Sequence, residues 1–121
     1  MIIGIGTDII EIERVRQAVG RNFFKRKVFT AAEQNYCESR GKQFAASYAA
    51  RFAAKEAFFK ALGTGIFTAL TEVEVINNSQ GQPEIFLHGD AEILAKEKGV
   101  EKIFLSLSHS KDFAVATAVL C

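Results

Sequence analysis

The alanine-rich run from about residue 42 to residue 62 limits the possible folds most, because it predicts one long helix. Alanine, leucine, lysine and glutamate favour helix, and neither glycine nor proline interrupts the run. About twenty helical residues make a rod about 30 Å long, and phenylalanines recur along it at helical spacings. Gly63 follows where helices commonly end in a left-handed residue. We therefore expect a central helix with one buried aromatic face, followed by a loop from Gly63 to Gly65.

Glu56 and Lys60 lie four residues apart on this predicted helix and therefore share one face. One interpretation is a solvated surface ion pair, which contributes about 0.2 to 0.5 kcal/mol to helix stability. The other is a functional site, because a carboxylate and an ammonium group beside a Gly-Thr-Gly loop can together hold a metal ion and a phosphate group. This segment by itself favours the surface pair.

The length of 121 residues, 49% of them hydrophobic, predicts a single domain spanning residues 1–121. No apolar run is long enough to span a membrane and no signal-peptide pattern opens the sequence, so we expect a cytoplasmic protein. Cys37 and Cys121 have no metal-binding spacing and are expected to be free thiols. The net charge of +1 gives no bulk attraction to nucleic acid or to a membrane.

Basic residues concentrate between residues 14 and 27, where apolar side chains are interleaved with them and acidic ones are absent. Such a stretch is often only a solvated face, but a local excess in a nearly neutral chain favours an acidic binding partner. The basic residues are Arg14, Arg16, Arg21, Lys25, Arg26 and Lys27.

The first third of the sequence predicts a short strand and two helices. Residues 1–5 are β-branched and apolar, which fits a buried strand. Asp8 and Glu11 have the spacing of a capping box, so Asp8 is first interpreted as the cap of a helix that ends near residue 20. Thr30 and Glu33 have the same spacing and predict the start of a second helix.

The second half changes to alternating periodicity. Residues 71–76 and 84–87 predict one β-hairpin, and residues 102–109 and 113–120 predict another. A short amphipathic helix is expected between the hairpins, over residues 90–98. Helices early in the chain and strands late in it indicate an α+β fold, with a mainly antiparallel sheet packed against the long central helix.

His109 lies at the predicted tip of the final hairpin, after Ser106 and Ser108. A histidine in such a place is most often simply exposed to solvent. Hydroxyl groups and an imidazole at a tight turn can also hold a phosphate or another acidic group. The residues alone leave both interpretations open.

Three segments in fixed order make the sequence similar to a known family. They are residues 4–12 (GIGTDIIEI), residues 51–65 (RFAAKEAFFKALGTG) and residues 107–110 (LSHS). The chain resembles the small bacterial holo-[acyl-carrier-protein] synthases, the short class of 4′-phosphopantetheinyl transferases, along its full length. The middle segment is the most specific, because helix propensity alone would not fix the glycine loop after it.

The resemblance implies transfer of the 4′-phosphopantetheine group of coenzyme A to a serine of apo acyl carrier protein, with Mg2+ as cofactor and release of adenosine 3′,5′-bisphosphate. It implies that Asp8 and Glu56 are metal ligands, since carboxylate oxygens suit Mg2+. Lys60 would stabilise or protonate the leaving group, which makes Asp8, Glu56 and Lys60 the expected catalytic residues. The general base stays open among a metal-bound water, one of the two carboxylates and an acidic residue of the carrier.

The resemblance also implies the partner contacts. The residues expected to bind coenzyme A are Lys55, Gly63, Gly65 and His109, although Lys55 is equally compatible with facing water. The residues expected to dock the acidic carrier protein are Arg14, Arg21 and Lys25. A homotrimer with coenzyme A bound between neighbouring subunits is expected from the family's assembly.

Two positions depart from the wider pattern. Ile10 stands where larger relatives of the superfamily carry a second acid, so a water molecule is expected to replace the third protein ligand. Phe67 stands where many members of the short class have glycine, so a stiffer loop is expected. Two other functions fit the same residues: a non-catalytic module that binds an acidic helix through residues 14–29, and a Mg2+-dependent nucleotide phosphohydrolase.

Overall fold

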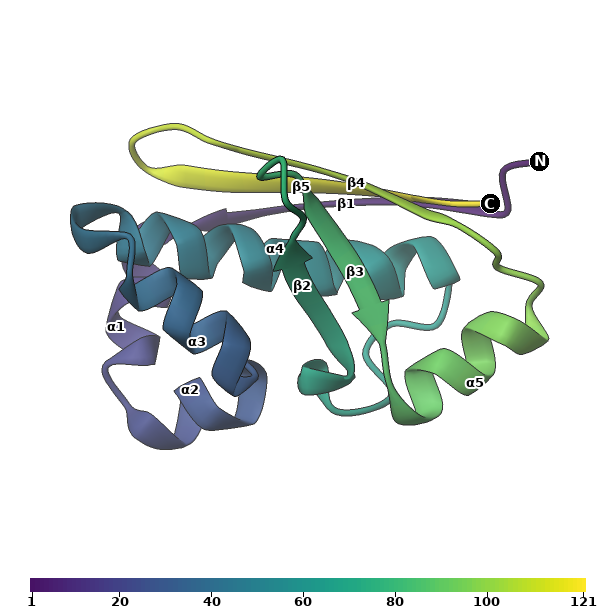
Figure 1. Cartoon of the computed structure of the whole chain (residues 1–121), viewed down its shortest axis with the longest axis horizontal. Helices are drawn as coiled ribbons and strands as arrows, with labels where there is room; N and C mark the ends of the chain where they lie inside the picture. The colour runs from purple at the N-terminus through teal and green to yellow at the C-terminus, as the bar shows by residue number, and fades with distance from the viewer.

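The computed structural model describes all residues 1–121 and has the expected α+β architecture. Its central element is α4, Phe44–Leu62, a helix of 19 residues that continues the short 3₁₀ helix η1, Gly41–Gln43. Gly63 ends α4 in the left-handed conformation, with φ of 82°. Figure 1 shows α4 lying along a long sheet, with α1, α2 and α3 gathered near its beginning and α5 near its end. The predicted central helix and its glycine cap are confirmed.

The larger sheet has three antiparallel strands in the order β1–β5–β4. The strands are β1, Gly4–Glu11; β4, Ile103–His109; and β5, Phe113–Leu120. Asp8 in β1 lies opposite Ala116 in β5, and His109 in β4 lies opposite Ala114 in β5. The predicted final hairpin is confirmed, and the N-terminal strand lies beside its second strand.

Small residues allow this sheet to lie close to α4. Ala114, Ala116 and Ala118 alternate along β5 and are fully buried. On β1, a Cβ atom added at Gly4 would collide with the carbonyl oxygen of Ala61, and one at Gly6 with α4 backbone atoms one turn earlier. Glycine is therefore required in β1 where the strand crosses α4.

The prediction that Asp8 caps a helix is wrong. Asp8 lies inside β1, and α1 begins only at Ile12 and runs to Val19, with Glu11 as its N-cap residue and no side-chain cap. Residues 4–11 pair continuously with β5, so hydrogen bonds to a distant strand satisfy their backbone. A local capping pattern cannot compete with this pairing, because both need the same backbone groups.

The other two N-terminal helices are α2, Asn22–Val28, and α3, Ala31–Glu38. The capping box before α3 is confirmed: Glu33 N donates to Thr30 Oγ1 at 3.2 Å, and Thr30 N donates to Glu33 Oε1 at 2.9 Å. This box brings the Glu33 side chain back over the start of the helix. Its carboxylate is fully buried there.

The smaller sheet contains the first predicted hairpin, which is confirmed. Its antiparallel strands are β2, Val73–Asn77, and β3, Pro83–Leu87, and η2, Leu70–Glu72, leads into β2. Helix α5, Gly89–Glu97, follows, and its alanines pack into the same core as α4 and β5. The helices of this chain are all too short or too polar to cross a membrane.

Candidate active site

Strand β1 and the second half of α4 bring Asp8 and Lys60 together. Lys60 Nζ donates to Asp8 Oδ1 at 3.0 Å and to the backbone carbonyl of Thr7 at 3.1 Å. Both side chains lie near the point where Gly4 and Gly6 allow β1 to contact α4. The glycines of the first motif thus position the acid that follows them.

Glu56 lies one turn before Lys60 on α4 and is half-buried. Burial raises the pKa of Glu56, the charge of Asp8 raises this pKa further, and Lys60 offsets part of the rise. The surface ion pair between Glu56 and Lys60 that helix spacing predicts is not formed, since the carboxylate that pairs with Lys60 is Asp8. The three expected catalytic side chains therefore lie at one place.

This group can bind a cation. Two neighbouring carboxylates repel each other, and a single lysine neutralises only one of them. Mg2+ is commonly held by one or two carboxylates, with water and substrate phosphates as its other ligands. No cluster of three or more histidine, cysteine, aspartate or glutamate side chains has metal-binding geometry here, and Ile10 packs against the core. Asp8 and Glu56 are therefore the side chains here that could hold such an ion.

The loop after α4 lies next to Lys60. Gly63 N donates to the carbonyl oxygens of Phe59 and Lys60, both at 3.1 Å, and Gly65 has a φ of 68°, which favours glycine. Phe67 packs edge-on against Phe59 with ring centroids 5.6 Å apart. This contact gives the loop an apolar anchor.

His109 lies apart from the two carboxylates. It lines a cavity of about 240 Å³ together with Ala46, a residue in the first half of α4. His109 in β4 pairs with Ala114 in β5, which pairs with Ile10 in β1, so two strand spacings of about 4.8 Å each separate His109 from the strand that carries Asp8. Within one chain, His109 is therefore not brought next to Asp8, Glu56 and Lys60. A ligand that touches both places must be long or must lie between two subunits.

Arg51 lines the same cavity; it is the first residue of the middle family motif, but no role was predicted for it. Its side chain is 3% exposed, Nη2 donates to Asn77 Oδ1 at 2.9 Å, and the guanidinium carbon lies 4.2 Å from the centre of the Tyr36 ring. The buried Nε atom has no hydrogen-bond partner. A buried cationic donor beside a cavity favours an anionic ligand. Its signal in the sequence is an arginine within an alanine-rich, buried helix.

A second hollow, of about 490 Å³, shares Gln43, Ala46 and His109 with the first. All the charged or titratable side chains that line it are basic, and no acidic residue contributes. They are Arg16, Lys42, His109 and Lys111. This end of the molecule thus has two adjoining hollows suited to phosphate groups.

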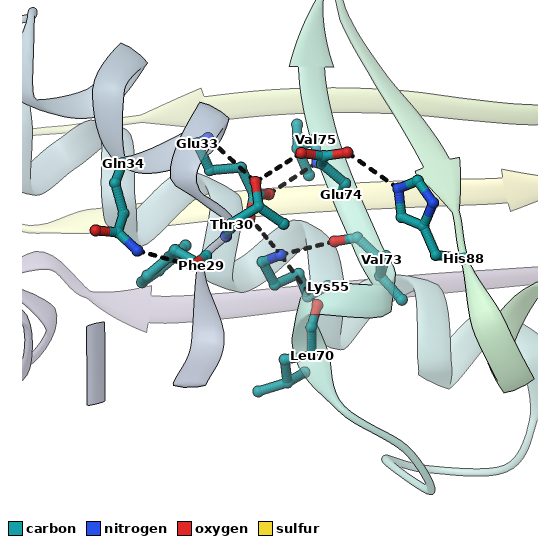
Figure 2. Close-up of polar contacts among 10 residues, drawn as sticks. All are labelled: Phe29, Thr30, Glu33, Gln34, Lys55, Leu70, Val73, Glu74, Val75 and His88. Atoms are coloured by element: carbon teal, nitrogen blue, oxygen red, sulfur yellow. Dashed lines mark hydrogen bonds and ion pairs between the residues drawn. The ribbon is translucent and has the colours of Figure 1, made fainter. Parts of the chain in front are cut away.

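Lys55 neither faces water nor is open to a ligand, so both expectations for it are wrong. Its side chain is fully buried, and its ammonium group donates to Glu33 Oε1 at 2.9 Å (Figure 2). Burial lowers the pKa of Lys55, and the charge of Glu33 opposes this effect. The ion pair could not be predicted from local sequence, because Glu33 lies on α3, 22 residues before Lys55.

The expected carrier-docking residues lie on one region of the chain. Arg14 is exposed on α1, Arg21 is the exposed N-cap residue of α2, and Lys25 on α2 pairs with Glu38 at 3.0 Å. Phe23 is among the most exposed apolar side chains, at 73%. The surface thus combines basic charge with an exposed aromatic ring.

Similarity to known proteins agrees with this geometry. Residues 4–118 match the family model described as the 4'-phosphopantetheinyl transferase superfamily. The chain is 48% identical to the holo-[acyl-carrier-protein] synthase of Ruminiclostridium cellulolyticum over 120 residues, which cover 96% of this chain and 90% of that protein. It is 46% identical to the synthase of Geotalea daltonii over 124 residues, 99% of this chain and 98% of the relative.

Two crystal structures show the same fold. The holo-[acyl-carrier-protein] synthase of Neisseria meningitidis matches with a TM-score of 0.86 at 35% identity, covering 99% of this chain and 98% of that chain. The synthase of Bacillus anthracis, in complex with CoA (3',5'-ADP), matches with a TM-score of 0.81 at 37% identity, covering 99% and 96%. The chain belongs to the holo-[acyl-carrier-protein] synthase family of the 4'-phosphopantetheinyl transferase superfamily.

Proposed function

We propose that this protein transfers the 4′-phosphopantetheine group of coenzyme A to a serine of apo acyl carrier protein. The observation that carries the proposal is the meeting of Asp8, Glu56 and Lys60 at the crossing of β1 and α4. The relatives are holo-[acyl-carrier-protein] synthases, and several related synthases have crystal structures in complex with coenzyme A.

Asp8 and Glu56 fit Mg2+ by their chemistry and their electrostatics. The raised pKa of Glu56 reflects burial and the charge of neighbouring Asp8, and a bound cation would relieve both effects. When bound there, Mg2+ would neutralise charge on the pyrophosphate of coenzyme A. The partial exposure of Lys60, at 52% of its side chain, leaves one side of the site open to a substrate.

The reaction joins the carrier's serine oxygen to the phosphorus of the pyrophosphate that bears the pantetheine group. The bond from this phosphorus to the bridging oxygen breaks, and adenosine 3′,5′-bisphosphate leaves. Lys60, held by Asp8 and the Thr7 carbonyl, stabilises the charge on the leaving phosphate or donates a proton to it. The serine proton passes to a general base, for which the two carboxylates, a water molecule and an acidic carrier residue are candidates.

The nucleotide end of coenzyme A would lie in the hollows around His109. Arg51 and the basic lining residues offer cationic donors for its phosphate groups. The backbone at Gly63 and Gly65 is proposed to contact the part of coenzyme A next to Lys60. The placement of His109 two strands away from the strand that carries Asp8 suits a long ligand, or a site shared by two subunits.

We further propose a homotrimer with active sites at its subunit interfaces. Side chains alternate along a strand, and the face of the larger sheet that points away from α4 carries exposed apolar residues. Unpaired apolar surfaces of this kind are typical of protein interfaces. The residues are Ile5 (66% exposed), Ile9 (64%), Phe104 (55%) and Phe113 (44%).

Arg14, Arg21 and Lys25 are proposed to dock acyl carrier protein. Opposite charges on the two partners would increase the rate of encounter and make it depend on salt. Exposed Phe23 offers an apolar anchor in the same region. The cytoplasmic location stays a prediction from the sequence.

The test is to incubate the purified protein with coenzyme A, Mg2+ and apo carrier, and to weigh the carrier by mass spectrometry. We expect the carrier to gain one phosphopantetheine group, and only when Mg2+ is present. An unmodified carrier would support the non-catalytic binding module instead. Products released from coenzyme A without any carrier would identify a phosphohydrolase.

A further inference from the structure

The buried ammonium group of Lys55 has every one of its protons engaged. It donates to Glu33 Oε1 at 2.9 Å, to the Val73 carbonyl at 2.7 Å and to the Leu70 carbonyl at 3.0 Å (Figure 2). An ammonium group has three donors, so no donor is left for a ligand. The role of Lys55 is therefore internal to the protein.

These three acceptors belong to separate elements of the fold. Glu33 lies on α3, Leu70 opens η2 and Val73 opens β2. Leu70 also ends the loop that starts at Gly63, beside Lys60. Lys55 thus ties α4 to the far end of the loop next to the proposed active site.

The carboxylate of Glu33 is as fully engaged as its partner. Its Oε1 accepts from Thr30 N as well as from Lys55, and its Oε2 accepts from Val75 N at 2.8 Å. Thr30 Oγ1 donates onward to Glu74 Oε2 at 2.6 Å, which places a second carboxylate in the network (Figure 2). Buried polar networks that are completely satisfied fix one arrangement of the elements they join.

Stability alone does not explain this ion pair. The free energy needed to remove two charges from water offsets much of their electrostatic attraction. Apolar residues of similar volume can often replace such a pair without loss of protein stability. The position of the pair is more informative, because Glu56 is the next residue on the helix. Successive residues point about 100° apart around a helix, so fixing the direction of Lys55 fixes that of Glu56.

We propose that Lys55 is a positioning residue, which sets the rotation of α4 so that Glu56 faces Asp8 and holds the end of the loop that begins at Gly63. This inference rests on the proposed function, in which Asp8 and Glu56 hold Mg2+. It gives Lys55 a part in the reaction without contact to coenzyme A, the carrier or the metal ion. The contacts in Figure 2 place Lys55 on the side of α4 that faces α3 and β2.

The test uses the full-length chain and two substitutions. Lys55→Met keeps most of the side-chain volume but strands the Glu33 carboxylate. The double variant Lys55→Met with Glu33→Gln removes both charges, so it keeps the test possible if the single variant does not fold. Thr30→Val is the matched control, because it breaks the hydroxyl contacts of the same network and leaves all three Lys55 bonds in place.

In the Lys55 variants we expect kcat to fall about 10- to 100-fold, the range found when residues supporting metal ligands are changed. Affinity for Mn2+, measured by calorimetry without substrates, should fall by a similar factor, while the KM for the carrier stays unchanged. Amide hydrogen exchange over residues 63–72 should accelerate and that of β5 should not. Thr30→Val should lower the melting temperature with little effect on kcat or on metal affinity.

Two results would overturn the proposal. One is a folded double variant with the kcat and Mn2+ affinity of the wild type. The other is an equal loss of both quantities in Thr30→Val at the same loss of melting temperature, which would make the network only structural. If the wild type itself leaves the carrier unmodified, the proposed function fails, yet the Mn2+ affinity and hydrogen exchange still decide the role of Lys55.

Discussion

Gly6→Ala would place a methyl group where β1 crosses α4. The atoms that this methyl would meet include the carbonyl oxygen of Ala57 and the amide nitrogen of Ala61, both far inside ordinary contact distance. These are backbone atoms of a helix, so no side chain can move aside. To restore ordinary contact, β1 must move away from α4 by about 1 Å.

This shift should damage activity more than stability. Overpacking of a well-packed core costs about 1 to 3 kcal/mol, which a chain of this size can survive. A displacement of about 1 Å between Asp8 on the strand and Glu56 on the helix can cost about 100-fold in rate. We therefore expect Gly6→Ala to fold, with a free energy of unfolding in urea that is lower by about 1 to 3 kcal/mol. We expect its kcat to fall by about two orders of magnitude.

The control for this variant is Gly20→Ala. Gly20 has a φ of −64°, and an added Cβ would meet only the Gln17 carbonyl oxygen, at 3.2 Å. This change should leave kcat unaltered, because the residue lies at the end of α1. A Gly6→Ala protein with wild-type kcat would refute the claim that glycine in β1 positions Asp8.

Four further predictions follow from the site and its surroundings. Glu56→Gln should retain the fold by circular dichroism but reduce transfer about 100-fold or more, because it removes one ligand charge; near-normal turnover would mean that Glu56 is not a ligand. Arg14→Glu should raise the KM for the carrier about tenfold and leave the KM for coenzyme A unchanged, whereas Lys98→Glu, at the residue that follows α5, should change neither. Ile9→Asp should dissociate the trimer in sedimentation experiments, and the equally polar change Ile93→Asp on α5 should not; a monomeric wild type would contradict the proposed assembly. Tyr48→Phe should lower stability at pH 7 more than at pH 3.5, because hydrogen bonds from Tyr48 and Lys25 lower the pKa of Glu38 in the folded state. The stability that these bonds contribute is present above the ordinary pKa of a glutamate and is lost as the pH falls through the lowered pKa of the folded state. An equal loss of stability at both pH values would contradict this linkage.

Features set by neighbouring residues were predictable from the sequence. The uninterrupted helix formers of α4, the glycine that ends it and the Thr30–Glu33 capping box are local patterns, and the structure confirms each of them. Both hairpins are also confirmed, because alternation and turn residues determine them locally. The resemblance to the holo-[acyl-carrier-protein] synthases is confirmed by sequence and by fold.

Features set by distant contacts were predicted wrongly or missed. Asp8 has the spacing of a helix cap, but pairing with β5, more than 100 residues away, makes it part of a strand. Lys55 looks like any helix-surface lysine until α3 and η2 fold over it. Arg51 was missed because the cavity it lines is formed by parts of the chain far from it in sequence. Each of these features depends on which secondary-structure elements contact one another, and local sequence patterns do not determine that.

The first two family motifs, residues 4–12 and 51–65, gain their physical meaning from one contact, the crossing of β1 and α4. Considered alone, Asp8 is a helix cap, and Glu56 and Lys60 are a surface pair. At the crossing, these interpretations fail together: the glycines permit the approach, the approach brings Asp8 to Lys60, and Glu56 then lies beside a second carboxylate without a lysine of its own. A chain with the same helix but larger residues in β1 would keep Glu56 and Lys60 on one helix face and lose the site. Gly6 and Asp8 are two residues apart and therefore lie on the same face of β1, the face toward α4. The close packing at Gly6 is thus what brings the Asp8 carboxylate to the site.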